Sequence, residues 1–174
     1  MTLIPAWGAD GVLRPTDKLD AHRRGLRHPA ISVFVLDDAG RTLLQQRAAE
    51  KYHTPLLWAN ACCTHPHWGE DMAACAARRL QEELGIRLPL HPRGRIEYRA
   101  DVGGGLTEHE LVEIFVAHAP PGLTPAPDPA EVAATRWVSV PALRAEIAAH
   151  PDRFTPWLRI YLAEHAERIL PELA

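Results

Sequence analysis

The sequence predicts an α/β sandwich of the α+β kind, in which helices flank a mixed central sheet within a single compact domain. The chain has 174 residues, enough to bury one continuous hydrophobic core. Hydrophobic residues make up 47% and charged residues 24%, as in ordinary globular proteins. Strand and helix patterns follow one another without strict alternation, which favours a sandwich over a doubly wound parallel sheet. We therefore expect one domain over residues 1–174.

The first half of the chain predicts a hairpin and a helix. Residues 30–36 are β-branched and aromatic, a turn follows at 38–40, and a second strand is expected over 41–46. We expect residues 51–70 to form a loop. A helix should follow, with Asp71 as its N-cap and Gly85 as its C-terminal stop. Spacings of three and four residues predict a core-facing stripe made of Ala73, Ala76, Ala77, Leu80 and Leu84.

The second half of the chain predicts further strands and two terminal helices. Five prolines between residues 120 and 129 indicate an irregular surface loop. The expected strands cover residues 95–102, 110–117 and 134–140, and the expected helices cover residues 141–149 and 157–170.

Charge and cysteine content restrict the possible partners. A net charge of −3 argues against broad electrostatic binding to nucleic acid or to an anionic membrane. No apolar run approaches the roughly 18 residues of a membrane span, and the first residues lack the basic start of a signal peptide. The three cysteines form a poor disulfide framework. We therefore expect free thiols and a cytoplasmic location.

One segment, residues 64–86, carries a specific motif. It reads THPHWGEDMAACAARRLQEELGI and resembles the Nudix box, which places a loop and a helix with metal-binding carboxylates against a diphosphate. The resemblance implies a Nudix-like fold. Thr64 stands where the box has its first glycine, and Arg79 stands where it has a glutamate. The matching positions are Glu70, Arg78, Leu80, Glu82, Glu83, Gly85 and Ile86.

The charged run has a simpler interpretation, a solvated helix with internal ion pairs. Seven specified positions match in order, however, which favours the Nudix interpretation. Arg79 then decides between functions, because a guanidinium binds diphosphate oxygens directly where a hydrolase keeps a metal carboxylate. Hydrolysis is therefore less expected than diphosphate recognition.

The flanking residues narrow the family. Residues 58–66, WANACCTHP, resemble the Asn-x-x-Cys-x-His-Pro signature of type I isopentenyl-diphosphate isomerases. The resemblance implies interconversion of isopentenyl and dimethylallyl diphosphate in isoprenoid biosynthesis, through protonation and deprotonation of the alkene. It extends over nearly the whole chain, through Lys18, Ala21-His22, Gly25-Leu26-Arg27-His28, Arg47, Lys51, Tyr98-Arg99-Ala100, Glu108-His109-Glu110 and Thr155-Pro156-Trp157.

The same resemblance implies a metal site. Three imidazoles and two carboxylates suit Zn²⁺ or Mn²⁺ better than Mg²⁺, whereas Mg²⁺ is expected to bridge the substrate diphosphate to Glu83. The ligands carried over from the family are His22, His28, His65, Glu108 and Glu110. The other histidines are expected to be structural or merely exposed, namely His53, His67, His91, His118, His150 and His165.

Catalytic and substrate-binding residues are carried over in the same way. Cys63 matches the family's catalytic thiol, and nearby cations should favour its thiolate. Glu110, near Tyr98, is expected on the acid side of the reaction. Trp157 should face the hydrocarbon and stabilise positive charge through its ring. The diphosphate is expected to contact Lys18, Arg47, Lys51 and Arg79, while Cys62 and Cys75 are expected to be small apolar filler.

Two other functions remain in competition. A Nudix diphosphate hydrolase is disfavoured by Arg79 and by the Cys63/His65 pair. A non-catalytic, zinc-stabilised binding module would explain the histidines but not Cys63 together with the basic residues and Glu83. The expected partner is a small isoprenoid diphosphate, with no nucleic acid and no membrane, and the chain is expected to be a monomer or weak homo-oligomer.

Overall fold

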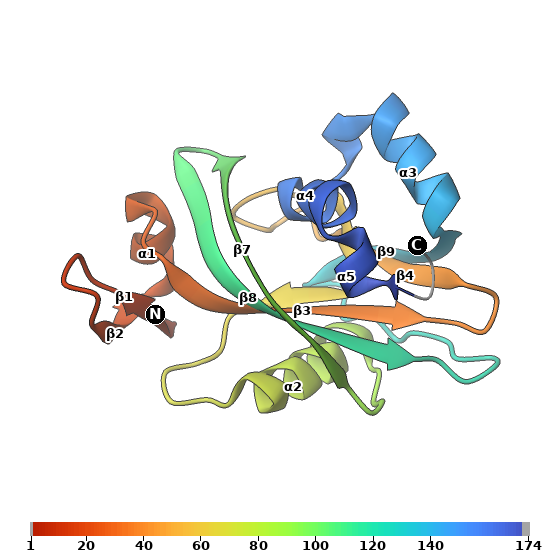
Figure 1. The fold of residues 1–174 in the computed structure, drawn as a ribbon, viewed down its shortest axis with the longest axis horizontal. Coiled ribbons are helices and arrows are strands. Elements are labelled where there is room, and N and C mark those ends of the chain that lie inside the picture. The colour runs from red at the N-terminus through yellow and green to blue at the C-terminus, as the bar shows by residue number, and fades with distance from the viewer. Residues whose placement is uncertain (1, 172–174) are drawn as a thin grey trace.

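A computed structural model describes residues 2–171, and a seven-stranded sheet forms the centre of the fold (Figure 1). The sheet runs in the order β5-β4-β3-β8-β7, with β9 paired to β4 and β6 paired to β3. Its strands are β3 (His28–Leu36), β4 (Arg41–Arg47), β5 (Trp58–Asn60), β6 (Cys62–Thr64), β7 (His91–Gly103), β8 (Leu106–His118) and β9 (Val132–Ser139).

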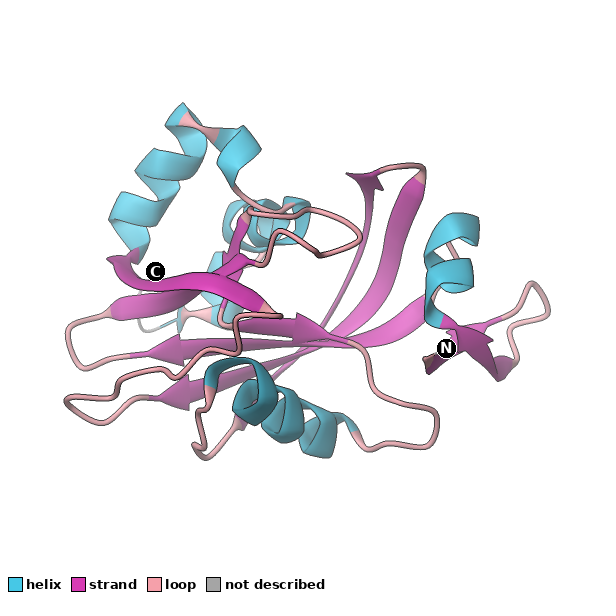
Figure 2. Cartoon of the chain, turned by 180° about the vertical axis from the view of Figure 1, so that it is seen from behind, coloured by secondary structure: helices cyan, strands magenta, loops and turns pink. Residues whose placement is uncertain are grey.

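The sheet is mixed, and helices cover both of its faces. Strands β3 and β8 are parallel, whereas β7 and β8 are antiparallel. Alternate residues of β3 enter two cores: Ile31 and Val33 pack on the side of α2 (Met72–Leu84), and Phe34 packs on the side of the C-terminal helices. Figures 1 and 2 show these helices on opposite sides of the sheet. The predicted sandwich is confirmed. The C-terminal helices are α3 (Val140–Ala149), a short 3-10 turn (Pro151–Arg153), α4 (Pro156–Glu164) and α5 (Ala166–Ile169).

Helix α2 begins and ends where its capping residues predict. The Asp71 carboxylate accepts a hydrogen bond from the Ala74 amide at 3.0 Å, and Gly85 ends the helix at a φ of 67°. The predicted stripe is partly wrong, because Ala73 and Ala77 are exposed. The helix packs on β3 and β6 through its sheet-facing side instead, which buries Cys75, Ala76, Leu80, Glu83 and Leu84.

The predicted loop over residues 51–70 is wrong in part, because it contains β5 and β6. Each has only three residues, too few to leave a periodic pattern. As predicted, the chain turns after β3. Strands β3 and β4 pair only at Leu36 and Thr42, however, and elsewhere each of them pairs with other strands. The helix predicted over residues 157–170 is broken at His165 into α4 and α5. The proline-rich stretch from residue 120 to 129 has no helix or strand, as predicted.

The N-terminal segment forms three elements that the sequence patterns do not predict. These are β1 (Leu3–Trp7), β2 (Leu13–Asp17) and α1 (Lys18–Arg24). Figure 1 shows them at one end of the sheet, where α1 contacts β8. Helix α1 thereby brings Lys18 and His22 to the site described below. Among the described residues, no helix is long and apolar enough to span a membrane.

Candidate active site

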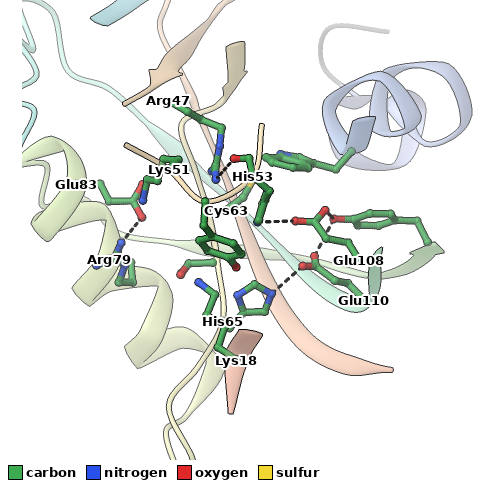
Figure 3. Close-up of a pocket in the computed structure, with 14 residues that line it drawn as sticks. Lys18, Arg47, Lys51, His53, Cys63, His65, Arg79, Glu83, Glu108 and Glu110 are labelled. Carbon is green, nitrogen blue, oxygen red and sulfur yellow. Dashed lines mark hydrogen bonds and ion pairs between the residues drawn. The ribbon is translucent and has the colours of Figure 1, made fainter. Parts of the chain in front are cut away.

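A pocket lies where the N-terminal segment, the central strands and α2 meet (Figure 3). Every residue predicted to be catalytic or substrate-binding lines it, and Tyr52, His53 and Thr64 join them. His22 and His28 lie behind the pocket wall, against the ring of His65, with ring centroids 5.0 and 4.8 Å from it. The structure therefore brings together residues spread from position 18 to position 157.

Two of the histidines have a defined tautomer. Nδ1 of His22 lies 2.7 Å from the Lys18 carbonyl oxygen, and Nδ1 of His28 lies 2.7 Å from that of Leu26. A carbonyl only accepts, so each Nδ1 carries the proton and each Nε2 offers a lone pair. Nε2 of His28 lies 3.1 Å from Nε2 of His65. Burial lowers the pKa of His22 to about 4 and that of His65 well below its usual value, so these imidazoles are neutral at pH 7.

Strand β8 supplies both carboxylates of the site. Glu108 and Glu110 are two residues apart and face the same side, while His109 contacts Glu97 on the other side. The hydroxyl of Tyr98, opposite Glu110 in the β7–β8 register, lies 2.7 Å from Glu108 and 2.9 Å from Glu110. Burial and the charge of Glu110 raise the pKa of Glu108. Burial opposes ionisation of Glu110 too, but the hydrogen bond with Nε2 of His65, at 2.8 Å, holds its pKa well below the usual value.

The histidine and carboxylate groups fit a divalent metal ion. Ligand atoms of His22, His28, His65 and Glu110 lie within 4.8 Å of one another. Nε2 of His22 is buried, and no described residue hydrogen-bonds to it, as expected for a nitrogen that binds a cation. Neutral imidazoles and carboxylates are the donor types that divalent transition metals bind.

His53 lies in this site, contrary to the prediction that it is structural or exposed. Its side chain is buried, and Nε2 lies 3.6 Å from a carboxylate oxygen of Glu108. With His22 and Glu108 it forms a second group whose ligand atoms lie within 4.8 Å of one another. Residues 51–57 have no periodic pattern, so only the tertiary structure reveals the position of His53.

Cys63 lies on β6 between polar neighbours. Its Sγ donates to the Asn60 side-chain oxygen at 2.9 Å and lies 2.9 Å from Oγ of Ser32. Burial raises the pKa of Cys63, and the carboxylates of Glu110 and Glu108 raise it further. The expectation of a thiolate was wrong for the protein groups alone, because desolvation and the two carboxylates outweigh the hydrogen bonds with Ser32 and Asn60, which lower the pKa of Cys63. Cys62 and Cys75 are buried in the apolar core beside α2, as predicted.

Cationic side chains gather at the α2 end of the pocket. Burial, then the charges of Lys51 and Arg47, lower the pKa of Lys18 to about 8. The Arg47 guanidinium lies 5.3 Å from the centre of the Trp157 ring. In Figure 3, Lys51 and Arg79 lie on one side of Cys63, and Glu108 and Glu110 lie on the other. The pocket therefore has a basic end and a carboxylate end.

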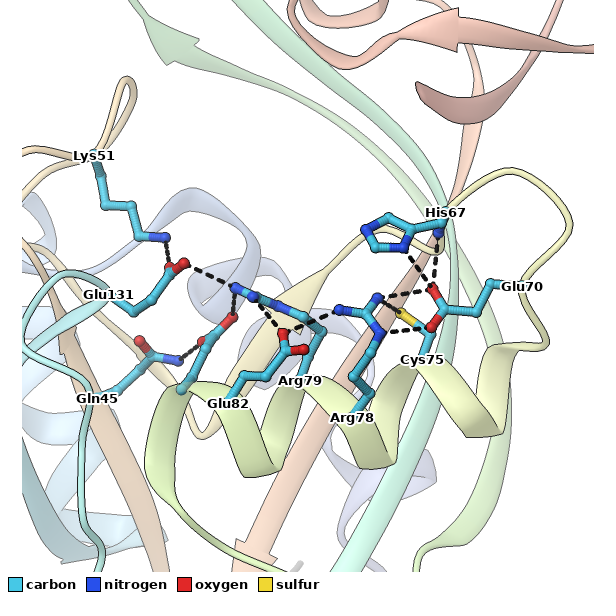
Figure 4. Close-up of polar contacts among 10 residues, drawn as sticks. Gln45, Lys51, His67, Glu70, Cys75, Arg78, Arg79, Glu82 and Glu131 are labelled. Atoms are coloured by element: carbon cyan, nitrogen blue, oxygen red, sulfur yellow. Dashed lines mark hydrogen bonds and ion pairs between the residues drawn. The ribbon is translucent and has the colours of Figure 1, made fainter. Parts of the chain in front are cut away.

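Ion pairs occupy Arg79 and Glu83 in this structure, and Figure 4 shows Arg79 among its acidic neighbours Glu82 and Glu131. Arg79 lies 2.6 Å from one carboxylate oxygen of Glu83, and Gln45 donates to the other at 2.8 Å. Arg79 also lies 3.2 Å from Glu131, which pairs with Lys51 as well. No pattern in the sequence indicates a role for Glu131. Arg79 therefore forms ion pairs within helix α2 and also lines the pocket.

Comparisons with known proteins place the chain in a family. The NUDIX domain model matches residues 26–158. The isopentenyl-diphosphate Delta-isomerase of Rhodobacter capsulatus is 63% identical over 88% of this chain and 86% of the relative. The isomerase of the same name from Roseobacter denitrificans is 57% identical over 99% of this chain and 97% of the relative. The chain belongs to the Nudix-domain isopentenyl-diphosphate Delta-isomerase family.

Membership of this family confirms the predicted family and enzyme class, and solved structures support the fold alone. A Deinococcus radiodurans crystal structure has a TM-score of 0.73 at 16% identity and covers 97% of this chain and 99% of its own. A MutT NUDIX hydrolase from Burkholderia pseudomallei has a TM-score of 0.61 at 24% identity, over 80% of this chain and 98% of its own. The isomerase family thus shares its sandwich with hydrolases, so the reaction depends on the residues of the site.

Proposed function

We propose that the pocket interconverts isopentenyl and dimethylallyl diphosphate, with the diphosphate at the basic end and the five-carbon chain between Cys63 and Glu110. The observation that carries this proposal is the placement of a thiol and a phenol-bridged carboxylate pair within one pocket that also has a cationic end. Binding the remote diphosphate through Lys18, Arg47, Lys51 and Arg79 would orient the reacting carbons, which carry no charge of their own.

Proton transfer is divided between two sides of the pocket in this proposal. Protonated Glu108 can donate to the oxygen of Tyr98 while Tyr98 donates to Glu110, so a proton of the pair can reach Glu110 for delivery to the alkene. Cys63 takes or returns the other proton, according to direction. The face of Trp157, buried beside the pocket, would stabilise positive charge on the substrate by about 0.5–2 kcal/mol.

Divalent ions complete the proposed site. His22, His28, His65, Glu108 and Glu110 would hold Mn²⁺ or Zn²⁺, which when bound stabilises negative charge on the carboxylates. Mg²⁺ would accompany the diphosphate beside Glu83, after Arg79 exchanges its pair with Glu83 for the substrate.

The cellular setting is part of the same proposal. Cys62, Cys63 and Cys75 are free thiols, which fits a reducing cytoplasm. Action as a monomer or weak homo-oligomer is part of the same proposal.

The direct test is incubation with isopentenyl diphosphate and identification of the product by NMR. We expect dimethylallyl diphosphate and no inorganic phosphate; release of phosphate would instead support a Nudix hydrolase. Chelation should abolish conversion, and Mn²⁺ or Zn²⁺ should restore it better than Mg²⁺ alone. A fully active metal-free preparation would rule out the metal site.

A further inference from the structure

His53 is held in the site by contacts that resemble those of the proposed ligands. Its side chain is 4% exposed, and Nε2 points toward Glu108 at 3.6 Å. Its ring stacks on that of His22, with centroids 5.6 Å apart and an interplanar angle of 25°. Figure 3 shows His53 directed at the carboxylate end of the pocket. The imidazole therefore faces the same carboxylates as the proposed ligands.

The other ring nitrogen of His53 has a fixed partner. Nδ1 lies 3.0 Å from the hydroxyl of Thr54. When Nδ1–H donates to this hydroxyl, Nε2 keeps its lone pair toward Glu108. His22 and His28 follow the same arrangement, with Nδ1 held by an oxygen and Nε2 directed into the site. An outer partner of this kind fixes the tautomer that binds metal.

The backbone next to His53 adopts a costly conformation. Thr54 has a φ of 46°, in the left-handed region that β-branched residues rarely occupy. Arg47 donates to the His53 carbonyl at 3.2 Å and holds this segment against the pocket. Strain of this kind concentrates at functional sites, where surrounding contacts stabilise it. Here it orients His53 and supplies the Thr54 hydroxyl to its ring.

The two potential metal-binding groups share one histidine, His22. One group contains His22, His28, His65 and Glu110, and the other contains His22, His53 and Glu108. His22 belongs to both, but its Nδ1 donates to the Lys18 carbonyl, so only the lone pair of Nε2 remains. One lone pair binds one ion. An ion bound through Nε2 of His22 is therefore common to both groups.

We propose that His53 is a direct ligand of this ion, so that four imidazoles and two carboxylates form its coordination shell. The inference rests on the proposed metal site and adds a ligand to it. A shell of six protein donors would leave no position for substrate on the ion. The ion would then act by fixing and charging the carboxylates, without direct contact with the diphosphate.

Cobalt substitution tests the proposal without measuring activity. In Co²⁺-loaded protein, each imidazole bound through Nε2 contributes one exchangeable, hyperfine-shifted Nδ1–H signal to the proton NMR spectrum. We expect four signals in the wild type and three in His53→Gln, which keeps a polar side chain of similar length. His118→Ala, an exposed change on β8, should keep four. In a chelator competition, His53→Ala should weaken Co²⁺ binding at least ~100-fold, the upper end of what outer partners contribute.

The outcomes separate this inference from the function on which it rests. A wild type that binds no Co²⁺ would overturn the whole metal site. Three signals in both the wild type and His53→Gln would overturn the His53 assignment alone. Weaker binding by His53→Ala with three signals in the wild type would make His53 a hydrogen-bond donor to Glu108, which also overturns direct ligation. Circular dichroism of each variant checks that it folds.

Discussion

Oγ of Ser32 lies 2.9 Å from Sγ of Cys63 and 3.0 Å from the hydroxyl of Tyr161. This contact joins β3, β6 and α4 at the proposed catalytic thiol. Asn60 accepts from the same thiol at 2.9 Å. Ser32 and Tyr161, which lie 129 positions apart in the chain, therefore both help to position Cys63.

Replacing Ser32 by Ala should lower kcat and leave KM nearly unchanged, because Ser32 positions Cys63 and does not line the pocket. One hydrogen bond contributes about 0.5–1.5 kcal/mol, equivalent to about a 2- to 10-fold change in rate. Tyr161→Phe is the matched control, because it keeps the contact between Ser32 and Cys63. Steady-state kinetics decide the matter, and a raised KM with normal kcat would assign Ser32 to substrate binding.

The pH dependence should reflect Lys18. Its pKa is lowered to about 8, so it is charged below that pH and loses its charge as the pH rises through 8. Because only the ammonium form attracts diphosphate, kcat/KM should fall on the alkaline side of about pH 8. Lys18→Arg should move this decline to higher pH, because a guanidinium stays protonated. The same alkaline decline in Lys18→Arg would show that another group causes it.

Arg79→Glu should raise the KM for isopentenyl diphosphate by about 10- to 100-fold, the range for loss of a charged hydrogen bond of about 1.5–3 kcal/mol. The new carboxylate would also stand beside Glu82, Glu83 and Glu131, where a cation would be needed to relieve repulsion. A small pyrophosphatase activity is therefore expected. Arg87→Glu, the same charge change on an exposed residue after α2, is the control. An unchanged KM in Arg79→Glu would contradict the proposed contact.

The helix that carries Arg79 and Glu83 should depend on its cap. Asp71→Ala removes the acceptor of the Ala74 amide and should lower the free energy of unfolding by about 1 kcal/mol. For a chain of this size, Tm should fall by about 2–4 °C. Asp71→Asn keeps an oxygen acceptor and should stay close to the wild type in thermal unfolding. Equal losses in both variants would assign the effect to charge and not to capping.

Local signals in the sequence predicted the central parts of the fold. Asp71 and Gly85 mark the ends of α2 because caps act within a few residues. Strands β5 and β6 escaped prediction because three-residue strands depend on the partners β4 and β3, which lie elsewhere in the chain. Ala73 was wrongly predicted to face the core. Helical spacing shows which residues share a face of the helix, but not which part of that face packs against the sheet.

Only those site residues that the family resemblance covers could be predicted from the sequence. Resemblance to the family identified residues on separate elements, such as His22 on α1 and Glu110 on β8, which no spacing rule connects. His53 was missed because its orientation comes from the left-handed Thr54 and from Arg47, both tertiary features. The protonated state of Cys63 was missed because burial and the carboxylates of Glu110 and Glu108, whose closeness a sequence does not display, raise the pKa of the thiol.

Isotope incorporation in deuterated water tests the central claim, that Cys63 and Glu110 transfer protons on opposite sides of the substrate. The wild type should place deuterium in the methyl group of dimethylallyl diphosphate and exchange it at the allylic carbon, as read by NMR. Cys63→Ser keeps the shape but raises the pKa far above that of a thiol. It should therefore lose about 100- to 10,000-fold in rate with folding and metal content intact. Near-normal turnover and exchange by Cys63→Ser would contradict the account and leave proton transfer to Tyr98 and the carboxylates.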